Sequence, residues 1–386
     1  MIRVLSILFM SSLLFSCSES VNTDLSNYGA EETFQLLLQE SIDDSFGAMP
    51  GVSMSINSSL LSQSWHGAAG YGDVEGNSTL RHEQVFRIAS VTKTFVAAAI
   101  LRLHELDSIS IEDPISYYID KNSIDVLKTD GYNPEQILIK HCLNHTSGLE
   151  DYIFVTDDYI NELISNPQKR WKREQQLEGA VNWGDKVGEP GEQTKYCDTG
   201  YILLGAIIES FFKGDMAQGL RTLLSYDRLG LTSTWLETLE PHPLDQSEKV
   251  HRYHGKYETT DWDASIDLFG GGGLVSNTAD LANFLSALFD NKVFDKPQTI
   301  NLMLSIPDHV QSTSTNDLSK IEYYNYGLWT IQAFGNNVHM HTGFWGTTVL
   351  YIPAYKSSIA VNGTRGNNDR MIKKTLLVLE KLSSRQ

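Results

Sequence analysis

The sequence predicts an α/β protein of the α+β type, in which helices from both ends of the chain flank an antiparallel sheet and a helical subdomain is inserted. Strand-like alternation occurs at residues 52–56, and several short strand-like segments follow residue 326. Apolar residues at helical spacing occupy residues 31–46 and 369–382, outside these strands. The middle of the chain is mainly helical, so we expect its two ends to form one domain around the insertion.

Changes in pattern along the chain give the expected boundaries. Residues 31–85 together with 255–386 form the α/β domain, and residues 86–254 form the mainly helical subdomain. Residues 18–30 are polar and are expected to be a tether. The other expected elements are helices at 92–106, 140–144, 199–212 and 278–289 and strands at 60–67, 326–333, 338–341, 348–353 and 359–362.

Composition limits the classes of partner. The chain has 386 residues, of which 41% are hydrophobic and 20% are charged, as in ordinary globular proteins. Its formal net charge of −18 argues against a nucleic acid or an anionic membrane surface as a partner, because both repel an acidic protein.

The first 17 residues have the pattern of an export signal. Arg3 supplies the positive charge, and residues 4–15 form an apolar stretch too short to span a bilayer. The stretch ends in Leu-Phe-Ser-Cys, which is similar to a bacterial lipobox, with lipidation expected at Cys17. A plain signal peptide that happens to contain a cysteine is the alternative. Either interpretation predicts an exported, periplasmic protein, and the first adds a lipid anchor in the membrane.

Two cysteines remain after Cys17. Cys142 and Cys197 could pair in an oxidising compartment, but each lies in a stretch that we interpret as structurally constrained. We expect two free, buried thiols.

The first candidate catalytic pair is Ser90 and Lys93. Residues three apart on a helix share a face, so the lysine could take the serine proton if its pKa were lowered by burial or by nearby cations. A position in the first helical turn would also leave the Ser90 N–H available to an oxyanion. The same Ser-x-x-Lys spacing recurs at Ser210 and Lys213, so the assignment depends on the accompanying motifs.

The second candidate group is Tyr196 and Asp198. Both follow a Pro-Gly turn and precede an apolar helix. A tyrosine held near a lysine can relay a proton between a nucleophile and a leaving group. The Asp198 carboxylate could cap the helix by accepting hydrogen bonds from the backbone N–H groups at its start, or it could make hydrogen bonds in an active site. The two roles are equally expected and compatible.

The third candidate group is His341, Thr342 and Gly343, at the end of a predicted strand. His341 and Thr342 could bind a substrate carboxylate or tune the tyrosine, while Gly343 would let a ligand approach the backbone. The N–H of Phe344 could then complete an oxyanion hole. His339 shares a strand face with His341, but a His-x-His-x-Asp zinc site would need aspartate where Gly343 stands, so we expect no metal.

The glycines at residues 270–273 are expected to form a flexible turn. No Gly-Lys-Ser/Thr follows them, so the stretch does not indicate a phosphate site, and no cofactor is expected.

Three segments, taken in chain order, resemble the three motifs of the serine β-lactamase and penicillin-binding protein superfamily. They are Ser-Val-Thr-Lys at 90–93, Tyr-x-Asp at 196–198 and His-Thr-Gly at 341–343. The similarity is greatest to the class C-like serine hydrolases, which include D-alanyl-D-alanine carboxypeptidases, D-aminopeptidases and esterases. Two further segments match this branch: Leu-Asn-His-Thr-Ser-Gly-Leu at 143–149 and the turn at 271–274. The resemblance covers roughly residues 31–382 and implies the β-lactamase/transpeptidase-like fold.

The resemblance implies a role for each motif position. Ser90 would be the acylated nucleophile, Lys93 its proton partner and Tyr196 the general base, with the Ser90 and Phe344 amides as the oxyanion hole. His341 stands where class C β-lactamases usually carry lysine. Asp198 replaces the commoner asparagine, which removes an amide donor and adds a negative charge. Both departures make an efficient β-lactamase less expected.

The resulting hypothesis is an exported serine hydrolase that forms an acyl-enzyme on a peptide, amide or ester, possible substrates including a peptidoglycan peptide. A D-Ala-D-Ala-type peptidase and an esterase rank level, ahead of a β-lactamase. The main alternative is a penicillin-binding sensor or scaffold of the same fold that does not hydrolyse its ligand. A metallohydrolase is the third possibility.

Overall fold

The structure, a computed structural model, describes residues 29–43, 49–243, 247–254, 257–307, 323–333, 335–365 and 368–384. The expected signal peptide, Cys17 and most of the expected tether lie outside the described residues. Within those described, no helix is both long and apolar enough to cross a membrane.

Eight of the described strands form one antiparallel sheet in the order β3-β2-β1-β13-β12-β11-β10-β9. The central pair joins the two ends of the chain, since Val52 of β1 lies opposite Gly363 of β13 and Ser58 lies opposite Ser357. The strands are β1 (Gly51–Ser58), β2 (Trp65–Asp73), β3 (Ser78–Thr79), β9 (Tyr323–Tyr324), β10 (Trp329–Ala333), β11 (Asn336–Gly343), β12 (Thr347–Ile352) and β13 (Ser357–Gly363).

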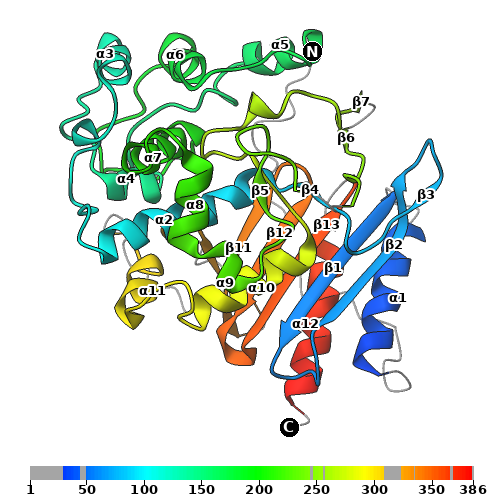
Figure 1. The fold of residues 1–386 in the computed structure, drawn as a ribbon. Coiled ribbons are helices and arrows are strands. Elements are labelled where there is room, and N and C mark those ends of the chain that lie inside the picture. The colour runs from blue at the N-terminus through cyan, green and yellow to red at the C-terminus, as the bar shows by residue number, and fades with distance from the viewer. Residues whose placement is uncertain are drawn as a thin grey trace.

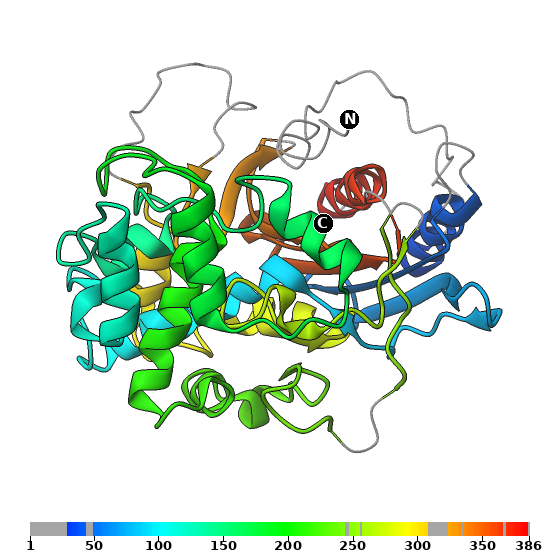
Figure 2. The ribbon, with the colours of Figure 1, turned by 90° about the horizontal axis from the view of Figure 1, so that it is seen from above.

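Helices cover both faces of this sheet. Helices α1 (Ala30–Asp43) and α12 (Asp369–Ser383) lie together on one face, and α10 (Thr278–Phe289) packs on the other (Figures 1 and 2). The apolar stripe of α1 includes Phe34 and Leu38, which join a core cluster with Met54 of the sheet and Leu379 of α12. This three-layer arrangement buries the apolar stripe of each helix.

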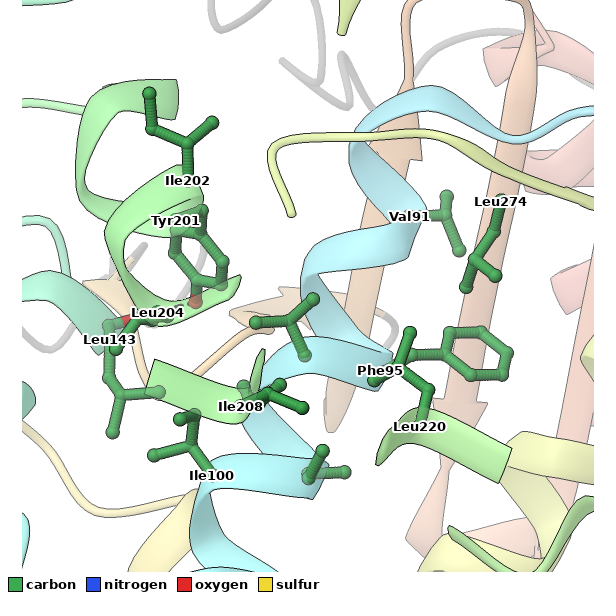
Figure 3. Packing of buried hydrophobic residues seen from close by; sticks show 14 of the residues in the cluster. Val91, Phe95, Ile100, Leu143, Tyr201, Ile202, Leu204, Ile208, Leu220 and Leu274 are labelled. Carbon is green, nitrogen blue, oxygen red and sulfur yellow. Dashed lines mark hydrogen bonds between the residues drawn. The ribbon is translucent and has the colours of Figure 1, made fainter. Parts of the chain in front are cut away.

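The helical part of the molecule surrounds α2 (Thr92–Glu105). Most side chains of α2 are buried, so this helix is a core element rather than an amphipathic surface helix. Phe95 and Ile100 of α2 belong to one buried cluster with Tyr201 and other apolar residues of the neighbouring helices, and Val91, just before α2, lies beside Leu274 (Figure 3). The other helices are α3 (Lys121–Thr129), α4 (Ile139–Leu143), α5 (Asp158–Ser165), α6 (Arg173–Trp183), α7 (Asp198–Phe211), α8 (Met216–Leu224), α9 (Tyr226–Leu229) and α11 (Pro297–Met303).

A small three-stranded sheet links the two parts in the order β4-β8-β5. It consists of β4 (Phe86–Arg87), β5 (Trp235–Leu236) and β8 (Leu274–Ser276), and a separate hairpin consists of β6 (Tyr253–His254) and β7 (Tyr257–Glu258). Beyond β4, the N–H of Ile88 donates to the carbonyl of Leu274 at 3.0 Å. This bond fixes the chain immediately before Ser90.

The predicted fold class is confirmed, but some boundaries were wrong. The strand expected at 60–67 begins only at Trp65, because the chain turns after Ser58, whose carbonyl accepts the N–H of Leu61 at 3.3 Å. The strand expected at 326–333 begins at Trp329, since Gly327 has φ of 82° in the turn before it. Helix α1 is described only to Asp43, and the end expected at residue 46 lies outside the described residues.

Candidate active site

Ser90 lies in a turn of 3₁₀ helix, Ala89–Val91, that leads directly into α2. Ala89 before it has φ of 47°, a left-handed conformation that costs an L residue roughly 1–2 kcal/mol. The half-buried Ser90 thus sits on a strained backbone held in place by β8. The prediction that Ser90 lies at a helix start is confirmed, with a 3₁₀ turn in place of the first α-turn.

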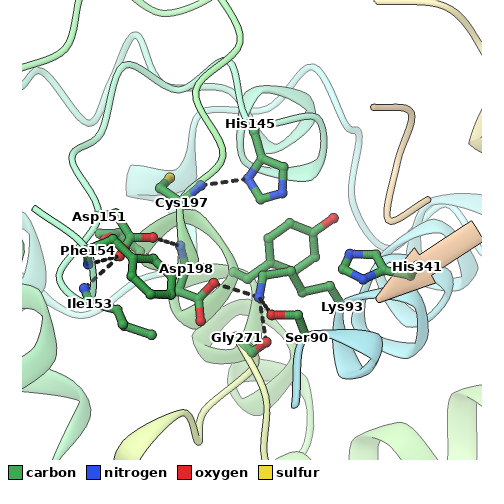
Figure 4. Close-up of polar contacts among 12 residues, drawn as sticks. Ser90, Lys93, His145, Asp151, Ile153, Phe154, Cys197, Asp198, Gly271 and His341 are labelled. Carbon is green, nitrogen blue, oxygen red and sulfur yellow. Dashed lines mark hydrogen bonds and ion pairs between the residues drawn. The ribbon is translucent and has the colours of Figure 1, made fainter. Parts of the chain in front are cut away.

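The Lys93 ammonium group joins three segments of the chain. Its Nζ donates to Ser90 Oγ at 3.0 Å and to the Gly271 carbonyl at 2.6 Å, and lies 2.6 Å from Asp198 Oδ1 (Figure 4). These contacts are enough to occupy the three N–H donors of an ammonium group. Lys93 is therefore oriented completely by its partners.

The charge of Lys93 differs from what its burial alone predicts. Burial lowers its pKa, but the Asp198 carboxylate and the Tyr196 phenol outweigh burial and hold the pKa well above its usual value. The sequence-based condition, that Lys93 accepts a proton because its pKa is lowered, is therefore not met in the resting structure. Lys93 is a cation at neutral pH.

Tyr196 lies close to both members of the first pair. The centre of its ring is 5.0 Å from Lys93 Nζ, and the positive charge of Lys93, followed by hydrogen bonding to Lys93 and Ser90, acts to lower its pKa. Burial works in the opposite direction and is stronger, so the pKa of Tyr196 rises to about 12. The resting side chain is a neutral phenol beside a cation.

Asp198 is an ion-pair partner and not the helix cap. The N-cap of α7 is Cys197, which has no side-chain capping bond, and Asp198 is the first helical residue. The capping role falls to Asp151, whose Oδ2 accepts the Asp198 N–H at 2.8 Å. Of the two predicted roles for Asp198, the structure supports bonding within the site, directed to Lys93.

Two carboxyl groups near this pair were missed in the sequence. Burial and repulsion by Asp198 raise the pKa of Asp151 to about 7, although backbone N–H groups of Ile153 and Phe154 bind it. Burial likewise raises the pKa of Asp267 to about 7, with Asp198 contributing and Arg87 opposing. Neither residue has a motif spacing that could have identified it.

The glycine turn at 270–273 has a more specific role than the flexible turn expected. A Cβ on Gly271 would lie 2.7 Å from Asp198 Oδ2, and one on Gly270, where φ is 126°, would lie 2.4 Å from the Tyr201 carbonyl. Glycine therefore allows this backbone to lie against α7 and offer its carbonyl to Lys93.

The third motif adjoins the nucleophile through Gly343. A Cβ at this position would lie 2.2 Å from the Ile88 carbonyl and 3.4 Å from Ala89 Cβ. The close approach that the glycine permits here is to the protein's own chain, and the approach of a ligand to this backbone stays a prediction. The contact brings Phe344, the next residue, near the turn that carries Ser90, and the role of its N–H in an oxyanion hole stays a prediction.

The predicted role of His341 in binding a substrate carboxylate is not supported by its contacts. Its Nδ1 lies 2.8 Å from the Thr342 carbonyl, which can only accept, so Nδ1 carries the proton. Nε2 then accepts from the Tyr324 hydroxyl at 3.0 Å. Burial and the charge of Lys93 lower the pKa of His341 to about 3. The imidazole is neutral, and both nitrogens are bound within the protein. Thr342 is half-buried on β11, and its substrate role stays a prediction.

His145, in the 143–149 stretch, is a second neutral imidazole near the site. Its Nδ1 accepts the Cys197 N–H at 3.3 Å, and its ring centre lies 4.2 Å from that of Tyr196 and 4.3 Å from that of Tyr324. Burial and the charge of Lys93 lower its pKa well below the usual value. The motif identified this stretch, but the contact partner Tyr324 carries no sequence signal.

The metal alternative finds no ligand set in the described parts of the chain, where no group of three or more His, Cys, Asp or Glu residues is placed to hold an ion. His339 instead contacts the Thr330 hydroxyl at 2.9 Å and stacks on Phe289. Cys142 and Cys197 are free and buried, which confirms that prediction.

The family model described as Beta-lactamase matches residues 44–382. The chain belongs to the beta-lactamase family. This confirms the resemblance and makes the protein a β-lactamase-fold serine hydrolase by family.

Relatives and solved structures agree with this assignment. The chain is 26% identical over 255 residues to penicillin-binding protein 4* of Bacillus subtilis, covering 60% of this chain and 51% of the relative, so it spans about half the length of that curated relative. It shares its fold with D-amino acid amidase from Ochrobactrum anthropi SV3, at a TM-score of 0.74 and 22% identity over 92% of this chain and 99% of the amidase. The hydrolase EstCE1 is similar at a TM-score of 0.68 and 20% identity, over 92% and 98% of the two chains.

Replacing Asp198 by asparagine tests the ion pair. Asp198→Asn leaves the buried Lys93 cation without its partner, and we expect a loss of about 3–5 kcal/mol in the free energy of unfolding at pH 7. Burial then lowers the folded-state pKa of Lys93 below its ordinary value of 10.5, so the variant gains stability as pH rises toward that value. The wild-type contribution stays constant over the same range, because its folded pKa lies above 10.5.

Urea unfolding of both proteins at pH 7 and pH 10 measures this difference. Asp125→Asn is the matched control, since Asp125 pairs with Lys121 at the surface and its loss should cost no more than about 0.5 kcal/mol. An Asp198→Asn loss that is no larger, or that is equal at both pH values, would contradict the assigned charge of Lys93.

Proposed function

We propose that the protein hydrolyses a peptide, amide or ester through an acyl-enzyme formed on Ser90. The observation that carries this proposal is the 3.0 Å contact between Ser90 Oγ and Lys93 Nζ, beside the Tyr196 phenol and the turn that bears Phe344. A D-Ala-D-Ala-type peptidase activity and an esterase activity are supported equally. The names of the relatives, which include a D-amino acid amidase, a penicillin-binding protein and a hydrolase with acyltransferase activity, span the same range.

The contacts suggest how the proton leaves Ser90. Lys93 already donates to Ser90 Oγ, so the serine hydrogen must point elsewhere, and Tyr196 is its neighbour. In the proposed reaction the Tyr196 phenol gives its own proton to the leaving group and takes the proton of Ser90 in its place, and the positive charge of Lys93 stabilises negative charge on the phenol oxygen during this relay. In the alternative route, Lys93 first transfers a proton to Asp198, and the neutral Lys93 amine then takes the proton of Ser90.

The non-hydrolytic sensor is the second candidate. Such a protein would carry the same Ser90 but would acylate slowly or not at all, and it would not turn over. The paired Lys93 and the adjacent Tyr196 favour turnover, because both groups are placed to move protons during deacylation as well.

We also propose export and lipid anchoring at Cys17. The support is the Arg3 charge, the apolar stretch at residues 4–15 and the Cys17 that follows it. Fractionation of expressing cells is expected to place the native protein with membranes and Cys17→Ser in the soluble exported fraction. A native protein found in the soluble exported fraction would favour the plain signal peptide.

Intact-protein mass spectrometry tests the nucleophile. The soluble protein from Ser18 is incubated with a penicillin and, separately, with a 4-nitrophenyl ester, and we expect a transient mass increase with product release. Ser90→Ala should abolish the adduct and lower turnover by at least about 10³-fold. Ser210→Ala, in the other Ser-x-x-Lys sequence, should behave as wild type, because Ser210 Oγ bonds the Ile207 carbonyl within α7. A permanent adduct would favour the sensor, and undiminished turnover by Ser90→Ala would refute the hydrolase.

Removing the Tyr196 hydroxyl separates the two proton routes. Tyr196→Phe keeps the ring near Lys93 but removes the relay, and we expect acylation and deacylation each to slow by about 10²–10⁴-fold in single-turnover kinetics. Tyr117→Phe is the control, since the Tyr117 side chain is exposed. A Tyr196→Phe rate within a few-fold of wild type would favour the route through Lys93 and Asp198.

A further inference from the structure

The loop that follows α4 holds the segment of chain around Tyr196. Before the tyrosine, the N–H of Gly191 donates to the Thr146 carbonyl at 2.7 Å. After it, the Thr199 hydroxyl donates to the Glu150 carbonyl at 2.6 Å. Both ends of the segment that carries the proposed proton relay are therefore bound to one short stretch of the chain.

His145 makes the contacts of this loop that lie nearest to Tyr196. Its carbonyl accepts the N–H of Lys195 at 2.9 Å, and its Nδ1 accepts the N–H of Cys197 at 3.3 Å (Figure 4). Lys195 and Cys197 are the residues directly before and after Tyr196. A single residue thus binds the backbone on both sides of the tyrosine, and its ring also packs against the tyrosine ring, with the two centres 4.2 Å apart.

The conformation and burial of His145 suit this double contact. Its φ of 59° is left-handed, a region that histidine and asparagine enter more readily than most residues do. The residue is 1% exposed, and the bond to Cys197 is the one hydrogen bond that the ring makes within the described chain. The hydrogen bonding of this side chain is therefore directed to the residue that follows Tyr196.

The imidazole of His145 keeps its Nδ1 available as an acceptor. Burial, followed by the charge of Lys93, lowers the pKa of His145 well below its usual value, so the ring is neutral. The Cys197 N–H can only donate, which makes Nδ1 the unprotonated nitrogen and leaves the proton on Nε2. The direction of the contact is thus the same at every pH at which the ring stays neutral.

We propose that His145 is a positioning residue, which holds the Tyr196 hydroxyl within reach of Ser90 by binding the backbone on both sides of the tyrosine. The proposal rests on the proposed hydrolase function, in which Tyr196 relays a proton. Misplacing a reacting group by about 1 Å can slow a reaction by about 10²-fold, so a contact that fixes Tyr196 raises the rate without touching the substrate. The effect of His145 must then pass through the Tyr196 hydroxyl.

Three substitutions separate the hydrogen bond of His145 from its ring. His145→Asn keeps an acceptor atom bonded to Cγ, as Nδ1 is, and tolerates the left-handed backbone. His145→Phe keeps a ring but removes the acceptor. His145→Gly removes both and adopts the left-handed conformation without strain, which covers the case in which His145→Phe does not fold. His242→Phe, at an exposed histidine, is the control.

Single-turnover acylation by a penicillin and by a 4-nitrophenyl ester measures the effect on the reaction. We expect His145→Phe and His145→Gly to slow acylation by about 10- to 100-fold, while the affinity for the substrate changes by no more than about threefold. His145→Asn should stay within about fivefold of the wild-type rate, because its acceptor is retained. His242→Phe should acylate as wild type does.

A double-mutant cycle distinguishes positioning of Tyr196 from a general structural role. In the Tyr196→Phe background, His145→Phe should change the acylation rate by less than about twofold, because no hydroxyl remains to be positioned. A purely structural role would slow both backgrounds by the same factor. Equal slowing in the two backgrounds would overturn the proposal, and so would wild-type acylation rates in His145→Phe and His145→Gly.

Hydrogen exchange at the Cys197 amide tests the contact without any reaction. The soluble protein from Ser18 contains two cysteines, Cys142 and Cys197, so isotopic labelling of cysteine nitrogen gives two amide signals by NMR. We expect the Cys197 amide to exchange at least about tenfold faster in His145→Phe and His145→Gly, while the Cys142 amide, within α4, keeps its rate. Unchanged Cys197 exchange in either folded variant would overturn the proposal.

The two measurements also separate this proposal from the hydrolase itself. If the wild-type protein shows no Ser90-dependent acylation by either reagent, the hydrolase is rejected, and the Cys197 exchange rates then decide whether His145 holds the Tyr196 segment. If wild type is acylated and the His145 variants meet neither expectation, the positioning role is rejected and the hydrolase is retained.

Discussion

One buried ion pair, between Lys93 and Asp198, is the interaction on which the site depends. Lys93 is fully buried, and a buried ammonium group is tolerated only when its charge is offset and its protons are bound. Its three contacts draw together the start of α2, the start of α7 and the turn at 270–273. The charge that serves the chemistry therefore also fixes the relative positions of three distant segments.

These segments can meet only because their backbones lie closer together than a Cβ atom would allow. Gly271 lies against the Asp198 carboxylate, and Gly343 lies against the chain at Ile88. The left-handed conformation of Ala89 lies in the same small region. Strain and close packing are concentrated around Ser90, where surrounding structure has to hold a reactive side chain in one position.

The protonation pattern keeps the number of charges in the site small. His341 and His145 are neutral because burial and the nearby Lys93 both disfavour a second cation. Asp198 balances Lys93, whereas an asparagine at this position would leave a net positive charge beside Ser90. The aspartate in the second motif therefore keeps Lys93 charged. Because a charged lysine cannot accept a proton, Tyr196 is the group left to transfer the proton.

The sequence by itself determined the fold class and the three motif segments. Periodicity reports which face of an element is buried, and the spacing of Ser90 and Lys93 is a local property of one short segment of the chain. Only the tertiary structure decided the partner of Asp198 and the tautomer of His341. The first depends on a contact between residues far apart in the chain, and the second on the burial of His341 against Tyr324, where water is excluded. Neither long-range contact nor burial at a single atom is encoded in a local pattern.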